Sequence, residues 1–246
     1  MLSRPPRRLG YAKVMSTAAV FVALGTAGSA VASPQFDSSY KLKLTTAKGA
    51  ASTGWSLDAS LRDPGDALKR PKILTGLRIN FPKGTRFDPK GHASCRVTDK
   101  QAVESTPEEV CPGTSYGTGQ AKVIVGSAPL AFPIQSYNIV PVDFGKRKPE
   151  LLLYVELDPN NPELAFQVEG ELSKSSIFFS LASAPEFDIH TTRIRFKLPA
   201  SRRGKHVFTR TPASCPRSKR WTAKVKATFA DGSNETQPIT LPCRRR

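Results

Sequence analysis

Three features that mark common classes of protein are missing from this chain. It has no run of about 20 predominantly apolar residues, which argues against a transmembrane anchor. It has no Cys-x-x-Cys pair, and only His92 lies near a cysteine, which argues against a zinc site. Its 21 prolines and 17 glycines leave almost no room for long helices. We expect neither a metal nor a cofactor.

Acidic residues are also scarce, with 20 Asp and Glu against 37 Lys and Arg, a formal net charge of +17. Such an excess favours contact with anionic polymers or lipid head groups, although scattered basic residues can also serve solubility alone. Nucleic acid is the other usual partner of basic proteins. No helix-turn-helix pattern, zinc-finger spacing or aromatic-rich RNA-binding strand occurs, so we do not expect nucleic acid as a partner.

The first 32 residues have the pattern of a cleaved signal peptide. A basic head without acids precedes a weakly apolar run over 14–27, and Ala30-Val31-Ala32 has the small-x-small form that a signal peptidase recognises. The adjacent Arg7 and Arg8 leave the twin-arginine export route open. Cleavage removes four basic residues and leaves +13 on residues 33–246. We expect that part to be secreted, without a membrane span, and associated with the cell envelope.

The four cysteines are even in number, which in an exported chain predicts disulfides. Three pairings are possible, and the spacing favours two local ones, Cys95–Cys111 and Cys215–Cys243. On the chain-entropy model, closing loops of about 15 and about 27 residues stabilises the fold by roughly 3 and 3.5 kcal/mol.

Apolar and polar residues alternate with period two along most of the chain, which predicts half-buried strands. These strands are expected at 40–46, 72–81, 121–125, 134–140, 151–157, 164–172, 177–181, 187–198, 221–229 and 239–241. The alternation changes parity near Thr191–Arg193, which indicates either a bulge or two strands. Short helical turns are expected at Lys100–Glu104, capped by Thr98 and Asp99, and after Thr106.

Many short strands separated by proline and glycine turns favour an all-β, antiparallel β-sandwich over a parallel α/β sheet. Residues 33–246 would form this domain. The best internal boundary falls at 146–149, although the flanking strands could equally belong to one sandwich.

Basic residues cluster beside proline or glycine at 69–72, 146–148, 202–205, 217–220 and 244–246, so we expect each cluster in an exposed loop or tail. The candidate anion-binding residues are Lys146, Arg147, Lys148, Arg202, Arg203, Arg217, Lys219 and Arg220.

The segment Gly113-Thr-Ser115-Tyr-Gly117 matches G-x-S-x-G, the nucleophile elbow of α/β-hydrolases. That elbow needs a strand before the serine and a helix after it. Here Glu-Glu-Val-Cys-Pro precedes it and a strand-like segment follows, so a simple turn is favoured. Asp188 and His206 would complete a hydrolase order, but a chain of this size offers such candidates by chance.

Other polar residues suggest chemistry only weakly. Asp188 and His190 share one face of a strand, which predicts a surface pair or, less favoured, a catalytic dyad. Four glutamates could supply a glycosidase carboxylate pair: Glu156, Glu163, Glu169 and Glu171. Trp55 and Trp221 are expected as core anchors more than as carbohydrate platforms.

Two blocks of sequence carry a resemblance to a known group. The C-terminal pattern runs from Cys215-Pro through Trp221, Phe229 and Asp231-Gly-Ser to Cys243, and the upstream block from Cys95 to Cys111-Pro and Gly119. They resemble uncharacterised secreted proteins of high-GC Gram-positive bacteria. The resemblance implies an exported, β-rich, four-cysteine domain and carries no assigned activity.

These observations together predict a secreted binding or structural component of the cell envelope. Its basic loops would contact an anionic polymer, lipid or polysaccharide. The alternative is a secreted serine hydrolase or glycosidase.

Overall fold

The computed structural model describes residues 38–98, 101, 105–139, 150–156, 165–181 and 188–244. The expected signal peptide, the 146–149 boundary and the candidate residues Lys146, Arg147 and Lys148 lie outside these residues. The contacts divide the chain into Met1–Pro34 and a compact unit from Gln35 to Arg246.

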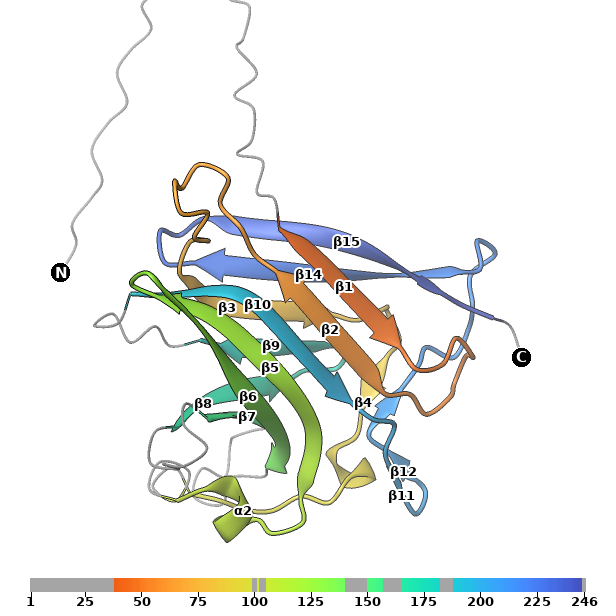
Figure 1. The fold of residues 1–246 in the computed structure, drawn as a ribbon. Helices are drawn as coiled ribbons and strands as arrows, with labels where there is room; N and C mark the ends of the chain where they lie inside the picture. Colours follow the sequence, from red (N-terminus) through yellow and green to blue (C-terminus); the bar gives the residue numbers. More distant parts are fainter. Residues whose placement is uncertain are drawn as a thin grey trace, which may run out of the picture. The chain divides into compact units, whose positions relative to one another are not determined.

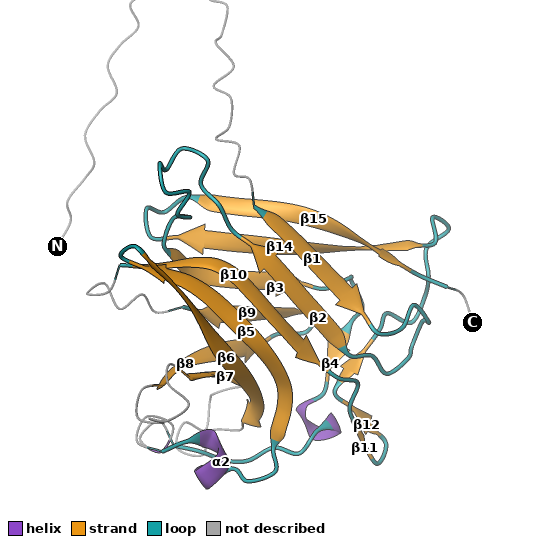
Figure 2. Ribbon diagram, viewed as in Figure 1, coloured by secondary structure: helices purple, strands orange, loops and turns teal. Residues whose placement is uncertain are grey.

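Strands make up most of the described chain (Figure 2). They are β1 (Ser39–Leu44), β2 (Trp55–Ser60), β3 (Leu74–Asn80), β4 (Arg86–Phe87), β5 (Ser115–Val125), β6 (Ala128–Ile139), β7 (Glu150–Glu156), β8 (Ala165–Leu172), β9 (Ser176–Ser180), β10 (Ile189–Leu198), β11 (Arg202–Arg203), β12 (His206–Val207), β13 (Thr209–Arg210), β14 (Arg220–Phe229) and β15 (Asn234–Pro242). The short helices are η1 (Pro89–Gly91) and α2 (Pro107–Val110).

Eleven strands form one continuous antiparallel sheet in the order β1-β2-β10-β5-β6-β7-β8-β9-β3-β14-β15. The sheet folds over on itself, so that β1, β2 and β10 lie in a layer in front of β3, β14 and β15 (Figure 1). Buried side chains from both layers form one main core. The expected antiparallel sandwich is therefore confirmed, and its two layers belong to the same sheet.

The alternation in the sequence explains which face of each strand is buried. In β14, Trp221, Ala223, Val225, Ala227 and Phe229 are buried, and the residues between them are exposed or half-buried. The parity change near Thr191 is a bulge in one strand, because the register of β10 against β5 shifts between Thr191 and Arg193. The two-strand alternative is thereby excluded.

Aromatic side chains fill the space between the layers. The fully buried Trp55 packs edge to face against Phe81 and Phe196, with ring centroids 5.0 and 5.1 Å apart. Trp221 is only 3% exposed, and its indole N–H donates to the carbonyl of Ser214 at 3.0 Å. Both tryptophans are thus core anchors, as expected, and neither is an exposed platform.

The two edge strands of the sheet meet along a seam. β1 and β15 contact each other but do not form a ladder. The Tyr40 amide donates to Oε1 of Gln237 at 3.1 Å, and the Tyr40 hydroxyl donates to Oε2 of Glu235 at 3.3 Å. Side chains thus cover strand edges that would otherwise present unpaired backbone groups to other chains.

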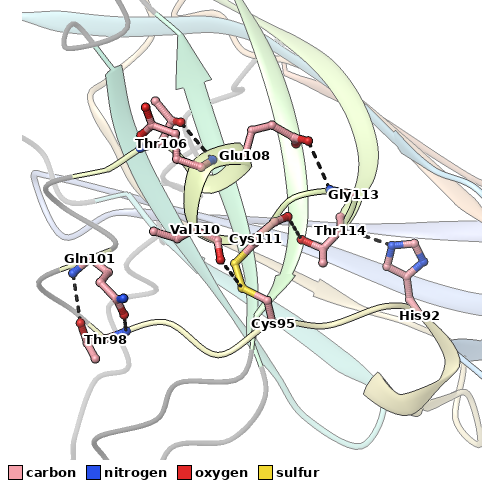
Figure 3. The surroundings of a disulfide bond; sticks show 11 residues. His92, Cys95, Thr98, Gln101, Thr106, Glu108, Val110, Cys111, Gly113 and Thr114 are labelled. Atoms are coloured by element: carbon pink, nitrogen blue, oxygen red, sulfur yellow. Dashed lines mark hydrogen bonds between the residues drawn. A yellow bond between two sulfur atoms is a disulfide. The ribbon is translucent and has the colours of Figure 1, made fainter.

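The Cys95–Cys111 disulfide, which was expected, ties a loop over the outside of the sheet (Figure 3). Cys111 and Val97 pack with Leu152 and Tyr154 of β7 in a small second core. The expected turn after Thr106 is α2, and Thr106 and Glu109 exchange the reciprocal hydrogen bonds of a capping box. Of the other expected turn, most lies outside the described residues, but Thr98 and Gln101 exchange the same kind of bonds.

Several strands were not expected from the sequence or are longer than expected; β6 and β15, for example, begin six and five residues before their expected starts. β2 was not expected, although Trp55, Leu57 and Ala59 alternate inward. β5 begins at Ser115, six residues before the expected start, and runs through Gly117 and Gly119. Glycines weaken the signal for a strand, because they contribute no side chain to the alternation.

Candidate anion-binding surface

The strand register collects four segments of the chain at one end of the sheet. Leu44, Trp55 and Leu198 are aligned across β1, β2 and β10, and Arg220 is aligned with Pro242 across β14 and β15. Residues 45–54, 81–92, 199–220 and 242–244 therefore lie at this end. We call these four segments the basic end.

A small hairpin carries the first group of charges. β11 pairs with β12, and Gly204 at the turn has a φ of 57°, which suits glycine. Arg202, Arg203 and Lys205 are exposed on this hairpin. The Arg202 Nε donates to the carbonyl of Gly204 at 2.9 Å, which holds that side chain beside the turn.

Hydrogen bonds join the hairpin to η1, and the exposed Lys90 of η1 is a further cation of the basic end. His206 Nδ1 lies 2.8 Å from Oδ2 of Asp88, and the Ser201 hydroxyl donates to the carbonyl of Gly91 at 2.9 Å. Burial opposes ionisation of Asp88, but hydrogen bonds from His206 and from the Lys90 amide outweigh it and lower the pKa of Asp88. Asp88 is thus held as an ionised anchor for the hairpin.

A two-residue ladder contributes a further pair of charges. β4 pairs with β13, which places Arg86 directly opposite Arg210. Both side chains are exposed. The backbones of Ser52 and Arg210 form an isolated β-bridge. Two like charges opposite each other are unfavourable in a free ladder, so this pairing favours an anion between them.

The second disulfide gathers the remaining charges at the C-terminal corner. The expected Cys215–Cys243 bond is present, and the Cys243 amide donates to the carbonyl of Lys219 at 3.0 Å. The backbones of Arg244 and Lys48 form an isolated β-bridge. Four basic side chains of this corner are exposed, those of Arg217, Lys219, Arg220 and Arg244.

The basic end carries almost no compensating charge. It holds twelve lysines and arginines, all exposed: Lys48, Lys83, Arg86, Lys90, Arg202, Arg203, Lys205, Arg210, Arg217, Lys219, Arg220 and Arg244. Asp88 is the only carboxylate in these four segments and faces His206, whereas the exposed Glu108 and Glu109 of α2 belong to the segment that leads into β5 at the same end of the sheet. Within the described chain, none of the twelve forms an ion pair. The fold therefore brings together the candidate clusters at 202–203 and 217–220.

The cluster at 69–72 lies at the opposite end of the sheet and is largely neutralised. Arg70 contacts carboxylates of Asp66 at 3.2 Å and Asp188 at 3.7 Å. Lys72 pairs with Asp231 in the β14–β15 turn. These acids come from distant parts of the chain, so the contrast between the two ends appears only in the fold.

The hydrolase pattern does not assemble. Ser115 begins β5 at the basic end, whereas Asp188 lies at the far end of the neighbouring strand β10. His206 pairs with Asp88, and Asp188 pairs instead with His190, whose Nε2 lies 2.8 Å from Oδ1. Asp188 and His190 are thus the side-chain pair that the sequence predicted.

The glycines of the G-x-S-x-G segment have a packing role. A Cβ on Gly117 would lie 2.5 Å from the carbonyl oxygen of Lys197, and one on Gly119 would lie 2.2 Å from that of Arg195. Both positions need glycine because the β10 backbone lies so close. Of the glutamates considered for glycoside chemistry, Glu169 and Glu171 are exposed on β8, Glu156 ends β7, and Glu163 lies outside the described residues.

One serine–histidine contact was not foreseen in the sequence. His92 Nδ1 lies 2.9 Å from the Ser201 hydroxyl oxygen, and Nε2 lies 3.3 Å from the carbonyl oxygen of Thr114 (Figure 3 shows the contact to Thr114). Burial is the main cause that lowers the pKa of His92, which favours the neutral ring. The two residues are 109 positions apart, so no local pattern could have indicated the pair.

The chain matches no protein-family model and no curated protein. Within the described residues, no group of three or more His, Cys, Asp or Glu side chains is placed to hold a metal ion. None of the helices in that part of the chain has the length and apolar character needed to cross a membrane.

Proposed function

We propose that this protein is an exported component of the cell envelope that binds an anionic surface polymer, lipid or polysaccharide through its basic end. The observation that carries the proposal is the placement of twelve exposed basic side chains from four segments at one end of the sheet, with Asp88 as the only carboxylate in those segments. Charges placed together without partners raise the local concentration of anions far more than the same charges scattered over a surface.

The leader-like first 32 residues and the two disulfides support export, because disulfides persist in oxidising compartments. The Cys215–Cys243 disulfide also stabilises the basic end, because it holds the corner on which Lys219 and Arg220 are exposed.

Retention on isolated cell envelopes across a salt series tests the proposal. Binding should be strong at low salt and fall steeply as salt rises, because exposed charges are screened within about 8 Å at physiological ionic strength. The double variant Arg202→Glu/Arg203→Glu should bind at least about tenfold more weakly, since each basic residue at an anionic surface contributes about 1 kcal/mol.

A matched control is available at the opposite end of the sheet. Arg62 and Lys69 are exposed and form no ion pair within the described chain. Arg62→Glu/Lys69→Glu changes the net charge by the same amount, and its binding should change less than about threefold. Equal losses in the two double variants, or binding indifferent to salt, would contradict attachment through the basic end.

Ester hydrolysis is a second candidate function, and the contact between Ser201 and His92 favours it. With Nε2–H donated to Thr114, Nδ1 would accept the Ser201 proton as the hydroxyl attacks the ester carbonyl carbon; the ester C–O bond then breaks, the alcohol leaves with that proton, and water hydrolyses the acyl-Ser201. The competing structural role is the hydrogen bond from Ser201 to Gly91. A fluorophosphonate probe separates them: labelling of wild type, absent in Ser201→Ala and in His92→Gln, supports hydrolysis, and no labelling of wild type excludes it.

A further inference from the structure

A second basic surface lies on the outer face of the sheet, separate from the basic end. The register of β1, β2, β10 and β5 aligns their outward residues in three rows. The rows are Lys43, Ser56, Lys197 and Thr118; Lys41, Asp58, Arg195 and Gln120; and Ser39, Ser60, Arg193 and Lys122. We call these twelve residues the sheet face. All are polar, and six are basic.

Asp58 is the only carboxylate on the sheet face, and it orders the two arginines. Arg193 donates to both Asp58 oxygens at 2.8 Å, and Arg195 Nε lies 3.3 Å from Oδ2. The four lysines around them, Lys41, Lys43, Lys122 and Lys197, are exposed and form no ion pair with any described residue. The sheet face thus has an ordered centre and a border of free cations.

The other layer does not repeat this arrangement. The outward side of β8 carries the acids Glu169 and Glu171, and the Arg78 guanidinium on β3 stacks over the ring of Phe178 at 4.5 Å. Its outward lysines on β14 are Lys224 and Lys226. Both layers therefore carry outward cations, but among the described residues only the sheet face has two arginines ordered by one carboxylate between exposed lysines.

The spacing of the charges indicates the kind of ligand. Arg193, Arg195 and Lys197 project from alternate positions of β10, and alternate positions in a strand are about 6.7 Å apart, separated by six backbone bonds. An extended phosphodiester of a three-carbon polyol also has six backbone bonds between phosphorus atoms: P–O, O–C, C–C, C–C, C–O and O–P. Its phosphates would therefore repeat at the spacing of the alternate β10 positions, where Arg193 and Arg195 both contact Asp58 and each keeps further N–H donors for a phosphate.

A single-stranded nucleic acid has the same number of backbone bonds per phosphate, but the face does not suit it. Proteins that bind single strands combine a cationic surface with aromatic side chains on which bases stack. None of the twelve residues of the sheet face is aromatic. The face therefore offers sites for phosphates and none for bases.

We propose that the sheet face binds a linear polyol phosphodiester that lies along β10, with its phosphates on Arg193, Arg195 and Lys197 and with Lys41, Lys43 and Lys122 at its sides. The proposal rests on the proposed function only for access to such a polymer, since none of these residues belongs to the basic end.

Affinity of the purified protein for synthetic polymers of equal charge tests this spacing. The three-carbon polymer should bind at least about tenfold more tightly than a five-carbon polyol phosphodiester, which has eight backbone bonds per repeat and so falls out of register. Equal affinity for the two polymers would overturn the match. Equal or tighter binding of single-stranded DNA would overturn the choice of a polyol polymer.

A pair of matched variants locates the binding. Lys41→Glu/Lys43→Glu changes two alternate exposed positions of β1 and should weaken binding of the three-carbon polymer at least about tenfold. Lys224→Glu/Lys226→Glu changes two alternate outward positions of β14 and should change it less than about threefold. Equal losses would show that net charge alone sets the affinity. This assay uses a purified polymer, and its variants change the sheet face and β14 only. Its outcome can therefore be told apart from that of the envelope-retention test of the basic end.

Discussion

The hydroxyl of Tyr40 donates a hydrogen bond to the carboxylate of Glu235, which lies 195 positions later in the chain. This bond joins β1 to β15, the first and last strands of the sheet. Closure of the sheet therefore depends on side chains at a seam, which makes the seam sensitive to the ionisation of Glu235.

The seam should lose stability as Glu235 ionises. Burial is the main cause that raises the pKa of Glu235 in the folded protein. A carboxyl whose pKa is higher in the folded than in the unfolded protein stabilises the fold at pH values below the unfolded pKa. That stabilisation is lost as pH rises through the folded-state pKa. Glu235→Gln keeps an acceptor for Tyr40 and cannot ionise. Its free energy of unfolding should rise relative to wild type between pH 4 and 7, as measured by urea denaturation. A constant difference over this range would show that Glu235 does not titrate at the seam.

Asp58 has the opposite pH dependence. The hydrogen bonds from Arg193, with smaller contributions from Arg195, lower the pKa of Asp58 in the folded protein despite partial burial. A lowered pKa stabilises the fold above the unfolded value and loses that effect as pH falls. Asp58→Asn should cost about 0.5–1 kcal/mol at pH 7, as expected for a half-exposed bidentate pair, and progressively less below about pH 4. A cost that persists unchanged in acid would assign the effect to packing.

Gly119→Ala should destabilise the protein strongly. The added methyl would meet the Arg195 carbonyl oxygen at 2.2 Å and the Phe196 Cβ at 2.7 Å, so β5 and β10 would have to separate. Overpacking of this kind costs about 1–3 kcal/mol. Gly65→Ala is the control, because its only near contact is the Asp63 side chain at 3.2 Å. Chemical denaturation of both variants provides the comparison. Similar stabilities would refute the close-approach role of Gly119.

The two disulfides should have different effects on binding. Cys215→Ser/Cys243→Ser should lower the free energy of unfolding by about 3.5 kcal/mol and also weaken anion binding, because it releases the corner that presents Lys219 and Arg220. Cys95→Ser/Cys111→Ser should lower the free energy of unfolding by about 3 kcal/mol and leave binding near the wild-type value, because the Cys95–Cys111 disulfide lies over β7. Denaturation and envelope retention of both variants check this, and equal binding losses would contradict it.

Much of the fold could be predicted from local patterns. The inward alternation of β14 and the spacing of the four cysteines each involve residues close in sequence. The first half of β5 was not predicted, because Gly117 and Gly119 are explained only by the backbone of β10, which lies about 75 positions later in the chain. Such a constraint leaves no local trace in the chain.

The candidate surface was predictable only in part. Arg202 and Arg203 stand out as a run, but Arg86, Arg210 and Lys48 are isolated and join the surface through strand pairing. The run at 69–72 shows the converse, because Asp188 and Asp231 neutralise it from a distance. Charge density in the sequence is therefore a poor guide to charge density on the surface.

Lysine footprinting on isolated envelopes tests the central claim most directly. The bound protein is acetylated, and the reaction of each lysine is compared with that of the free protein. Lys90, Lys205 and Lys219 of the basic end should be protected at least about threefold, whereas Lys69 at the opposite end should react as it does in solution. Protection of Lys69 with free reaction of Lys90 and Lys205, or uniform protection of all four, would contradict binding through the basic end.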